Sequence, residues 1–272
     1  MTTLVPDNYG LANNIKALIS AKNLYGNAKP DWVRWKYNNL FELDPVEETQ
    51  DQKSNTYYNF RFLFKELDYL DEHFNLFYFP RDCKDGRCID HMFSMVPQTI
   101  RNIIINSLYD LSPNQRVMEK CAEFYKRHRY TIAVHYRTFN TDHFDKFDFN
   151  FDDSELFGIL ENFPATDVFL ATDNFEMGYA FTQRSKHRFH MFRDATLDWQ
   201  QNALADMLLL SKGQLLFTPQ FSTFSELSWY WGNCRQDVCN YRSSDFFQRS
   251  GQKFKTVWHR GTDHEKPNGH AG

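Results

Sequence analysis

The sequence lacks several features that would place it in familiar classes of protein. No run approaches the roughly 20 apolar residues of a membrane-spanning helix, and no signal peptide is visible. The net charge is −4, without the basic balance that is usual in nucleic-acid-binding proteins. No G-x-G-x-x-G follows a predicted strand, which disfavours a dehydrogenase. We therefore expect a cytoplasmic chain with no integral membrane segment and no nucleic-acid partner.

Cysteine is also scarce, because five residues do not form the disulfide framework of a small secreted domain. Two pairs have the same spacing, Cys83 with Cys88 and Cys234 with Cys239. Each pair could close a disulfide loop in an oxidising compartment. All four could instead bind zinc, although zinc ribbons usually space their ligands by two to four residues. We expect free thiols, with disulfides and a metal site as the alternatives.

The second half of the chain alternates between strand and helix patterns. This alternation is typical of a doubly wound parallel sheet. The expected strands are 131–135, 167–172, 188–192 and 214–218, and the expected helices are 153–162, 174–185, 199–212 and 222–232.

The first half is less regular. Apolar spacing predicts helices over 11–24 and 96–111. A third helix is expected over about 112–128, with Ser112 as its N-cap and Pro113 at its first position. Other expectations are a strand over 32–35, a polar loop over 44–55, an aromatic core segment over 56–80 and a turn or loop over 81–88.

The stretch from Tyr130 to Asn140 contains the first candidate site. Thr131 to Val134 is a short apolar run rich in β-branched residues, which indicates a buried strand. His135 and Arg137 follow two residues apart, so both side chains point to the same side of a strand. Because ligands of open α/β sheets bind beyond the carboxyl ends of the strands, this pair indicates an anion site. The alternative is an arginine that caps the sheet edge through a local carboxylate.

Two further strand ends carry polar side chains that would meet this pair at one edge of the sheet. One strand ends in Thr-Asp-Asn, with Asp173 in the centre, and another is followed by Ser222 and Thr223 at a helix start. Hydroxyls and free backbone N–H groups at a helix start suit a phosphate, and the same holds for Gly10 before the first helix. Asp206, in the apolar helix ALADMLLLSK, is either a satisfied cap or an acceptor that faces a ligand.

The order of these motifs resembles a known family. GLANN lies near the start, HYR and FLATDN follow successive strands, and ADMLLLSK precedes FSTFSEL. This set is similar to the GDP-fucose-dependent fucosyltransferases of the nodulation and α1,6 type. Those enzymes carry a G-x-G-N helix start, an H-x-R-R-x-D motif, an A-T-D-D motif and an acidic helix before a serine-rich loop. The resemblance spans about 9–232.

The resemblance implies a metal-independent glycosyltransferase with a GDP-fucose donor, a glycan acceptor and no cofactor. Arg137 would bind the β-phosphate and act in catalysis, with His135 beside it. Asp206 would bind guanine, and Asn13 would face the donor from the N-terminal domain. The complete set of donor-binding residues is Gly10, Asn13, His135, Arg137, Asp173, Asp206, Ser222 and Thr223.

The implied fold is GT-B-like, with two Rossmann-like α/β domains and the donor in the C-terminal doubly wound parallel sheet. We expect an acceptor-side domain over 1–125, a donor-binding domain over 126–255 and a mobile tail over 256–272, whose end lacks apolar residues.

The chain departs from the family motifs at Ala12, Thr138, Asn140 and Asn174, which replace glycine, arginine, aspartate and aspartate. One cation fewer leaves open another nucleotide sugar as the donor. It also leaves open a non-catalytic module that binds a nucleotide or a sugar.

A metal-dependent hydrolase is a third reading of the same stretch, although the spacing of its candidate ligands matches no metal motif. These ligands are His135, Asp142, His143, Asp145, His187 and His190. The candidates for a general base in glycosyl transfer are Asp142, Asp145 and Asp173.

Overall fold

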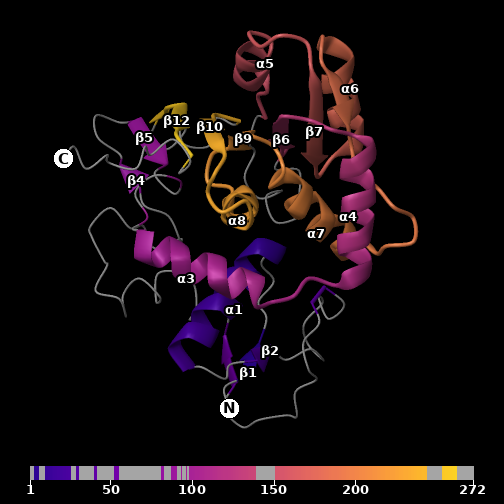
Figure 1. The fold of residues 1–272 in the computed structure, drawn as a ribbon. Coiled ribbons are helices and arrows are strands. Elements are labelled where there is room, and N and C mark those ends of the chain that lie inside the picture. Colours follow the sequence, from indigo (N-terminus) through magenta and orange to yellow (C-terminus); the bar gives the residue numbers. More distant parts are fainter. Residues whose placement is uncertain are drawn as a thin grey trace, which may run out of the picture.

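The computed structural model describes residues 3–5, 10–25, 29–30, 40–41, 52–54, 81–82, 87–90, 93, 96, 98–138, 151–243 and 253–261. Its largest part is a sheet with helices on both faces (Figure 1). The helices are α1 (Leu11–Tyr25), α3 (Gln98–Tyr109), α4 (Gln115–Arg127), α5 (Ser154–Leu160), α6 (Phe175–Arg184), α7 (Trp199–Leu210) and α8 (Thr223–Trp231). The strands are β1 (Thr3–Val5), β2 (Lys29–Pro30), β3 (Gln52–Ser54), β4 (Arg81–Asp82), β5 (Arg87–Asp90), β6 (Ile132–Tyr136), β7 (Asp167–Thr172), β8 (Arg188–His190), β9 (Leu215–Pro219), β10 (Asp237–Tyr241), β11 (Lys253–Phe254) and β12 (Val257–His259).

The main sheet has six strands in the order β12-β10-β9-β6-β7-β8. Neighbouring strands are parallel except for β12, which is antiparallel to β10. The chain runs from β6 outward to β8, and then returns to β9 and β10 on the other side of β6. Such a reversal of strand order opens a crevice beyond the carboxyl ends of the strands. The predicted doubly wound parallel sheet is confirmed. Two smaller three-stranded sheets, β2-β1-β3 and β11-β5-β4, accompany it.

The two faces of the main sheet have separate cores, because side chains alternate along each strand. Ala133 and Phe169 point to the face that α4, α7 and α8 cover. Val134 and Leu170 point to the opposite face, where α5 and α6 pack. All five residues of β6 are buried, so this strand lies in the interior of the molecule. The side chains at its end therefore have a defined position.

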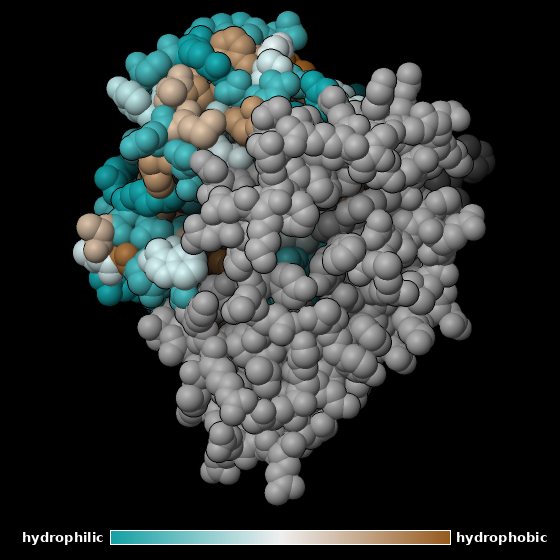
Figure 2. All heavy atoms as spheres, turned by 180° about the vertical axis from the view of Figure 1, so that it is seen from behind, coloured by the Kyte–Doolittle hydropathy of each residue, from teal (hydrophilic) through white to brown (hydrophobic). Residues whose placement is uncertain are grey.

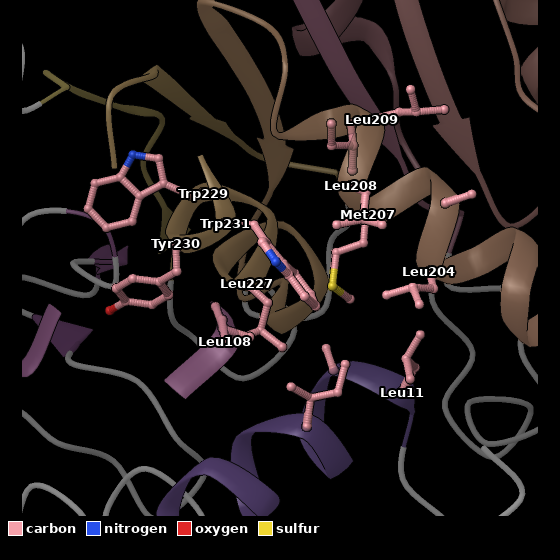
Figure 3. Packing of buried hydrophobic residues seen from close by; sticks show 14 of the residues in the cluster. Leu11, Leu108, Leu204, Met207, Leu208, Leu209, Leu227, Trp229, Tyr230 and Trp231 are labelled. Carbon is pink, nitrogen blue, oxygen red and sulfur yellow. The ribbon is translucent and has the colours of Figure 1, made fainter. Parts of the chain in front are cut away.

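Helices α1 and α3 belong to the same core as α7 and α8. Figure 3 shows Leu11 of α1 and Leu108 of α3 facing apolar side chains of these two helices, among them Met207 and Leu227. All four residues are buried within one continuous cluster. The start of α1 is therefore anchored against the helices that follow β8 and β9. The division at residue 125 stays a prediction.

Three of the helices beyond strand ends begin with the capping residues that favour helix starts. Asn174 accepts a hydrogen bond from Met177 N (3.1 Å) and caps α6. Asp198 and Gln201 form a capping box at α7, and Ser222 caps α8. Asn174 departs from the family motif, but asparagine caps a helix as well as aspartate does.

The predicted start of α4 is wrong. Ser112 has a φ of 45°, the cap is Asn114, and the helix begins at Gln115. The reason is tertiary: Asn114 N donates to Leu40 O (2.8 Å), and Pro113 forms a bridge with Phe41. The chain at Pro113 is thus paired with a distant segment instead of being helical.

The tail also differs from the prediction. Val257–His259 forms β12 at the edge of the main sheet, and Gly261 N donates to Asp237 Oδ1 at 2.8 Å. Residues 257–261 are therefore fixed by strand pairing with β10 and by the hydrogen bond to Asp237, and they do not form a mobile tail. Strand β3 lies in the expected polar loop, β4 lies in the expected turn or loop over 81–88, and β5 begins there. The expected strand over 32–35 and the aromatic segment over 56–80 lie outside the described residues.

Three cysteines of the described part are buried and form no disulfide: Cys121, Cys234 and Cys239. Burial raises the pKa of each thiol to about 12. A disulfide between Cys234 and Cys239 is thus contradicted, while Cys83 lies outside the described residues.

The visible surface of the described part is mostly hydrophilic with isolated hydrophobic side chains, as Figure 2 shows over the region of α5 and α6. Among the described residues, no helix combines the length and apolar character needed to cross a membrane.

Candidate active site

A cavity of about 890 Å³ lies at the carboxyl-terminal edge of the main sheet. Its wall contains the residues after β6, β7 and β8, together with the starts of α1 and α8 and part of α7. Its volume is within the range of sites for small molecules and cofactors, and its position matches the reversal of strand order.

Seven of the eight predicted donor-binding residues line this cavity, and Ser222 does not. The seven come from five segments that lie far apart in the sequence. The fold therefore brings these segments together around one cavity. The lining residues are Gly10, Asn13, His135, Arg137, Asp173, Asp206 and Thr223. Their individual roles remain predictions.

His135, at the end of β6, is buried and hydrogen-bonded on its inner side. Its Nδ1 lies 2.7 Å from Ser225 Oγ and 3.1 Å from Ser222 Oγ. Burial, with a smaller effect of the nearby Arg137 charge, lowers the pKa of His135 to about 3. His135 is therefore neutral, and it adds a hydrogen-bonding ring to the site instead of a second cation.

Ser222 has a different position from the one that the sequence suggested. It is buried, its Oγ accepts from Ser225 N (3.3 Å) as the cap of α8, and it contacts His135. Thr223, the next residue, lines the cavity. The residue that lines the cavity is thus the first residue of the helix, and the capping serine contacts His135.

Arg137 and Asp173 follow adjacent parallel strands. Tyr136 pairs with Thr172, so the next residue of each strand lies at the same level of the sheet edge. Burial lowers the pKa of Arg137 and the charge of Asp173 opposes this effect. A guanidinium nevertheless stays protonated in proteins, so Arg137 is a permanent cation in the wall.

Thr138, which replaces the second arginine of the family motif, engages Asp173. Its backbone N and its Oγ1 donate to Asp173 Oδ1 at 3.0 and 3.2 Å. Of the three candidate bases, Asp173 is therefore already hydrogen-bonded, and Asp142 and Asp145 lie outside the described residues.

Arg193 is the site residue that sequence reasoning missed. It lies three residues after the end of β8, lines the cavity, and donates from Nη1 to Asp206 Oδ2 at 2.8 Å. The same rule that identified Arg137, a cation just beyond a parallel strand, could have identified it. The cavity thus contains a second guanidinium even though Thr138 replaces the second arginine of the motif.

Asp206 lies within α7 and is not its cap, which is Asp198. Its side chain is 7% exposed, and its Oδ1 has no hydrogen-bond partner among the described residues. Burial raises the pKa of Asp206 to about 7, although the charge of Arg193 opposes the rise. Asn13 Oδ1 is likewise buried without a partner in the described part. The wall therefore contains two unpaired acceptors, which suit a ligand with N–H donors.

The metal-site alternative finds no support at the strand ends. Within the described residues, no group of three or more His, Cys, Asp or Glu is arranged to hold a metal ion. His187 Nε2 lies 3.0 Å from Leu160 O, and His190 pairs with Asp167 at the start of β7. Neither histidine lines the cavity, and Asp142, His143 and Asp145 lie outside the described residues.

Comparison with solved structures shows which fold this is. NodZ alpha-1,6-fucosyltransferase soaked with GDP-fucose matches over 96% of this chain and 99% of its own, with a TM-score of 0.54 and 13% identity. Fucosyltransferase NodZ from Bradyrhizobium matches over 96% and 98%, with a TM-score of 0.53 and 13% identity. NodZ co-crystallised with GDP matches over 88% and 94%, with a TM-score of 0.51 and 14% identity. No family model and no curated protein matches the sequence. The resemblance to this family is therefore confirmed in the fold.

Proposed function

We propose that this chain is a glycosyltransferase, most simply a fucosyltransferase, that moves a sugar from a GDP-sugar to a glycan hydroxyl without a metal ion. The observation that carries the proposal is a single cavity that presents both the permanent cation of Arg137 and the unpaired buried Oδ1 of Asp206. The cation suits a diphosphate, and the acceptor suits a base with N–H donors. The fold supports the same ligand, because NodZ crystals have been soaked with GDP-fucose and NodZ has been co-crystallised with GDP.

The chemistry follows from the charges that develop during transfer. Breaking the bond from the anomeric carbon to the diphosphate builds negative charge on the leaving phosphate. A fixed cation at that phosphate interacts more strongly with the transition state than with the ground state, and this lowers the barrier. We assign this task to Arg137, because it directly follows the central strand β6, whose five residues are all buried.

The other lining residues would bind the rest of the donor. Thr223 opens α8, where its hydroxyl and the free backbone N–H groups of the first turn favour a phosphate. Asp206 would accept a hydrogen bond from guanine. Gly10 and Asn13 would approach the donor from α1, and the arrangement would then be GT-B-like, with an acceptor-side domain facing the donor-binding domain.

The test is to measure thermal unfolding and binding isotherms with GDP, UDP and ADP in the presence of EDTA. We expect GDP to stabilise the protein most, by about 2.7 kcal/mol at a hundredfold excess over its Kd, since it binds only the folded state. Stabilisation that appears only with Mg²⁺ or Mn²⁺ would contradict the metal-independent proposal.

A non-catalytic nucleotide- or sugar-binding module is the second candidate, and Thr138 is the observation that favours it. Threonine replaces a motif arginine there and engages Asp173, which could otherwise act as the base. Incubation with GDP-fucose separates the two functions. Slow hydrolysis of the donor without an acceptor would indicate a transferase, whereas tight binding with intact donor would indicate a module.

A further inference from the structure

The guanidinium of Arg193 makes more contacts with the protein than that of an arginine on the open surface. Nη1 donates to Asp206 Oδ2 at 2.8 Å and to Phe192 O at 2.7 Å, and Nη2 donates to Thr172 O at 3.2 Å. The guanidinium carbon lies 4.0 Å from the centre of the Phe175 ring, a cation–π contact. A planar group with this many contacts has a defined position, even though 39% of the side chain is exposed.

The contact with Asp206 is asymmetric. Arg193 occupies Oδ2, while Oδ1 has no partner among the described residues. An ionised carboxylate accepts hydrogen bonds at both oxygens, whereas a protonated one presents an O–H donor at one of them. A buried carboxyl group protonates readily unless a cation lies beside it. The state of Asp206, acceptor or donor, therefore depends on Arg193.

Other titratable groups around Asp206 cannot replace that cation. Cys121 of α4 and Tyr130, which precedes β6, are the further groups that interact electrostatically with Asp206. Both are neutral, because burial raises the pKa of each well above its usual range. Arg193 is thus the cation paired with Asp206 in the described part of the chain.

We propose that Arg193 is a positioning residue of the nucleotide site, which keeps Asp206 ionised and oriented so that Oδ1 accepts a hydrogen bond from a nucleobase N–H. This inference rests on the proposed function and adds to it the residue that sets base preference. The favoured base carries an N–H where guanine has N1–H, and adenine, whose N1 is an acceptor, is disfavoured. Arg193 acts through Asp206 and is distinct from Arg137, to which we assign the phosphate.

The inference predicts how affinity depends on pH. Wild-type affinity for GDP should fall as the pH drops below about 7, because protonation of Asp206 replaces the acceptor by a donor. Without the positive charge of Arg193 the carboxyl group binds its proton more tightly. In Arg193→Gln the midpoint of this pH dependence should therefore move upward by about 1–3 pH units, the usual effect of a nearby opposite charge. The preference for GDP over ADP at pH 7.5 should decrease in parallel.

The experiment is isothermal titration of the full chain with GDP and ADP from pH 6 to 9. It compares the wild type, Arg193→Gln, Arg193→Lys and the control Arg188→Gln. Arg188 also pairs with an aspartate, Asp167, but at the opposite end of β7 and β8, outside the cavity lining. The control should keep the wild-type midpoint. Arg193→Lys retains the charge but cannot make all the contacts of the planar group, so its midpoint should lie between those of wild type and Arg193→Gln.

The outcomes separate this inference from the proposed function. No binding of GDP by the wild type at any pH would overturn the proposed function and the inference with it. Binding by the wild type, with the same midpoint and base preference in Arg193→Gln, would overturn the inference alone. If Arg193→Gln does not fold by circular dichroism, a wild-type midpoint in Arg193→Lys overturns it equally.

Discussion

The guanidinium groups of Arg137 and Arg193 line the same cavity but have different neighbours. We therefore assign them different roles in donor binding. The charge of Arg193 is balanced at 2.8 Å by Asp206. Arg137 lies beside Asp173, whose Oδ1 already accepts two hydrogen bonds from Thr138. A ligand diphosphate at Arg193 would have to compete with Asp206 for the guanidinium, and we assign the leaving group to Arg137, the cation that follows the central strand β6.

Replacement of Arg137 tests that assignment. Arg137→Ala should reduce turnover with GDP-fucose roughly 10²–10³-fold, the usual cost of losing one preorganised electrostatic group. Arg137→Lys should recover only part, because an ammonium cannot bind phosphate through two coplanar N–H bonds. The measurement is steady-state transfer, or donor hydrolysis, with thermal unfolding of each variant.

The matched control is Arg184→Ala. Arg184 lies on α6, pairs with Asp153 at 2.7 Å and does not line the cavity. Turnover in this variant should stay close to that of the wild type. Turnover near the wild-type value in Arg137→Ala would refute both the mechanism and the assigned role of this residue.

At the scale of elements, a buried ion pair joins α1 to α8. Lys16 Nζ lies 2.5 Å from Glu226 Oε2, and the two side chains are 0% and 3% exposed. Lys16 lies one turn after Asn13, which lines the cavity, and Glu226 follows Ser225, which contacts His135. The pair therefore holds the start of one helix at a fixed distance from the start of the other, and so sets two walls of the site.

Lys16→Met should destabilise the fold strongly, because it leaves the carboxylate of Glu226 buried without its cation. The expected loss in the free energy of unfolding is about 3–5 kcal/mol, measured by urea denaturation. The affinity for GDP should fall as well, since Gly10 and Asn13 lose their anchor. The double variant Lys16→Met with Glu226→Leu should recover stability, because an apolar pair replaces a buried ionic one.

An exposed ion pair supplies the comparison. Arg127 and Glu123 of α4 lie 3.1 Å apart, with side chains 62% and 58% exposed. Arg127→Met should cost about 0.3–0.5 kcal/mol, as solvent-exposed pairs one turn apart usually do. Similar losses in Lys16→Met and Arg127→Met would mean that the buried pair does not anchor α1.

At the scale of the whole molecule, the C-terminal segment completes the main sheet. Strand β12 covers the edge of β10, and the chain then passes close to the turn before β10. A Cβ atom on Gly261 would lie 1.8 Å from Arg235 O, far inside any real contact. The close approach needs glycine there, so the backbone of this segment is part of the packed structure.

Gly261→Ala should lower the melting temperature, because Arg235 or the segment after β12 must move and the pairing of β12 is strained. Gly158→Ala is the control, since a Cβ there meets nothing within 4 Å on the exposed side of α5. This second change should raise stability by up to about 1 kcal/mol, the difference in helix propensity. The melting temperatures of both variants are measured by differential scanning calorimetry. An unchanged melting temperature in Gly261→Ala would mean that the C-terminal segment does not contribute to the fold.

Features that depend on local pattern could be predicted from the amino-acid sequence. The length and the flanking residues of the apolar segments predicted a helix at α7 and a strand at β7. The alternation of these segments determined the parallel sheet, and its parallel strands bring Arg137 and Asp173 to one edge. The ordered motifs indicated the fold that the NodZ structures share.

Features that depend on distant partners could be seen only in the folded chain. Pairing of Asn114 with Leu40 moved the start of α4, and pairing with β10 made Val257–His259 a strand of the main sheet. Burial made His135 neutral, and the Arg193–Asp206 contact gave the cavity a second cation and left one carboxylate oxygen unpaired. The physical reason is common to all four: charge state and pairing are set by the groups that surround a residue in space, and those groups come from elsewhere in the chain.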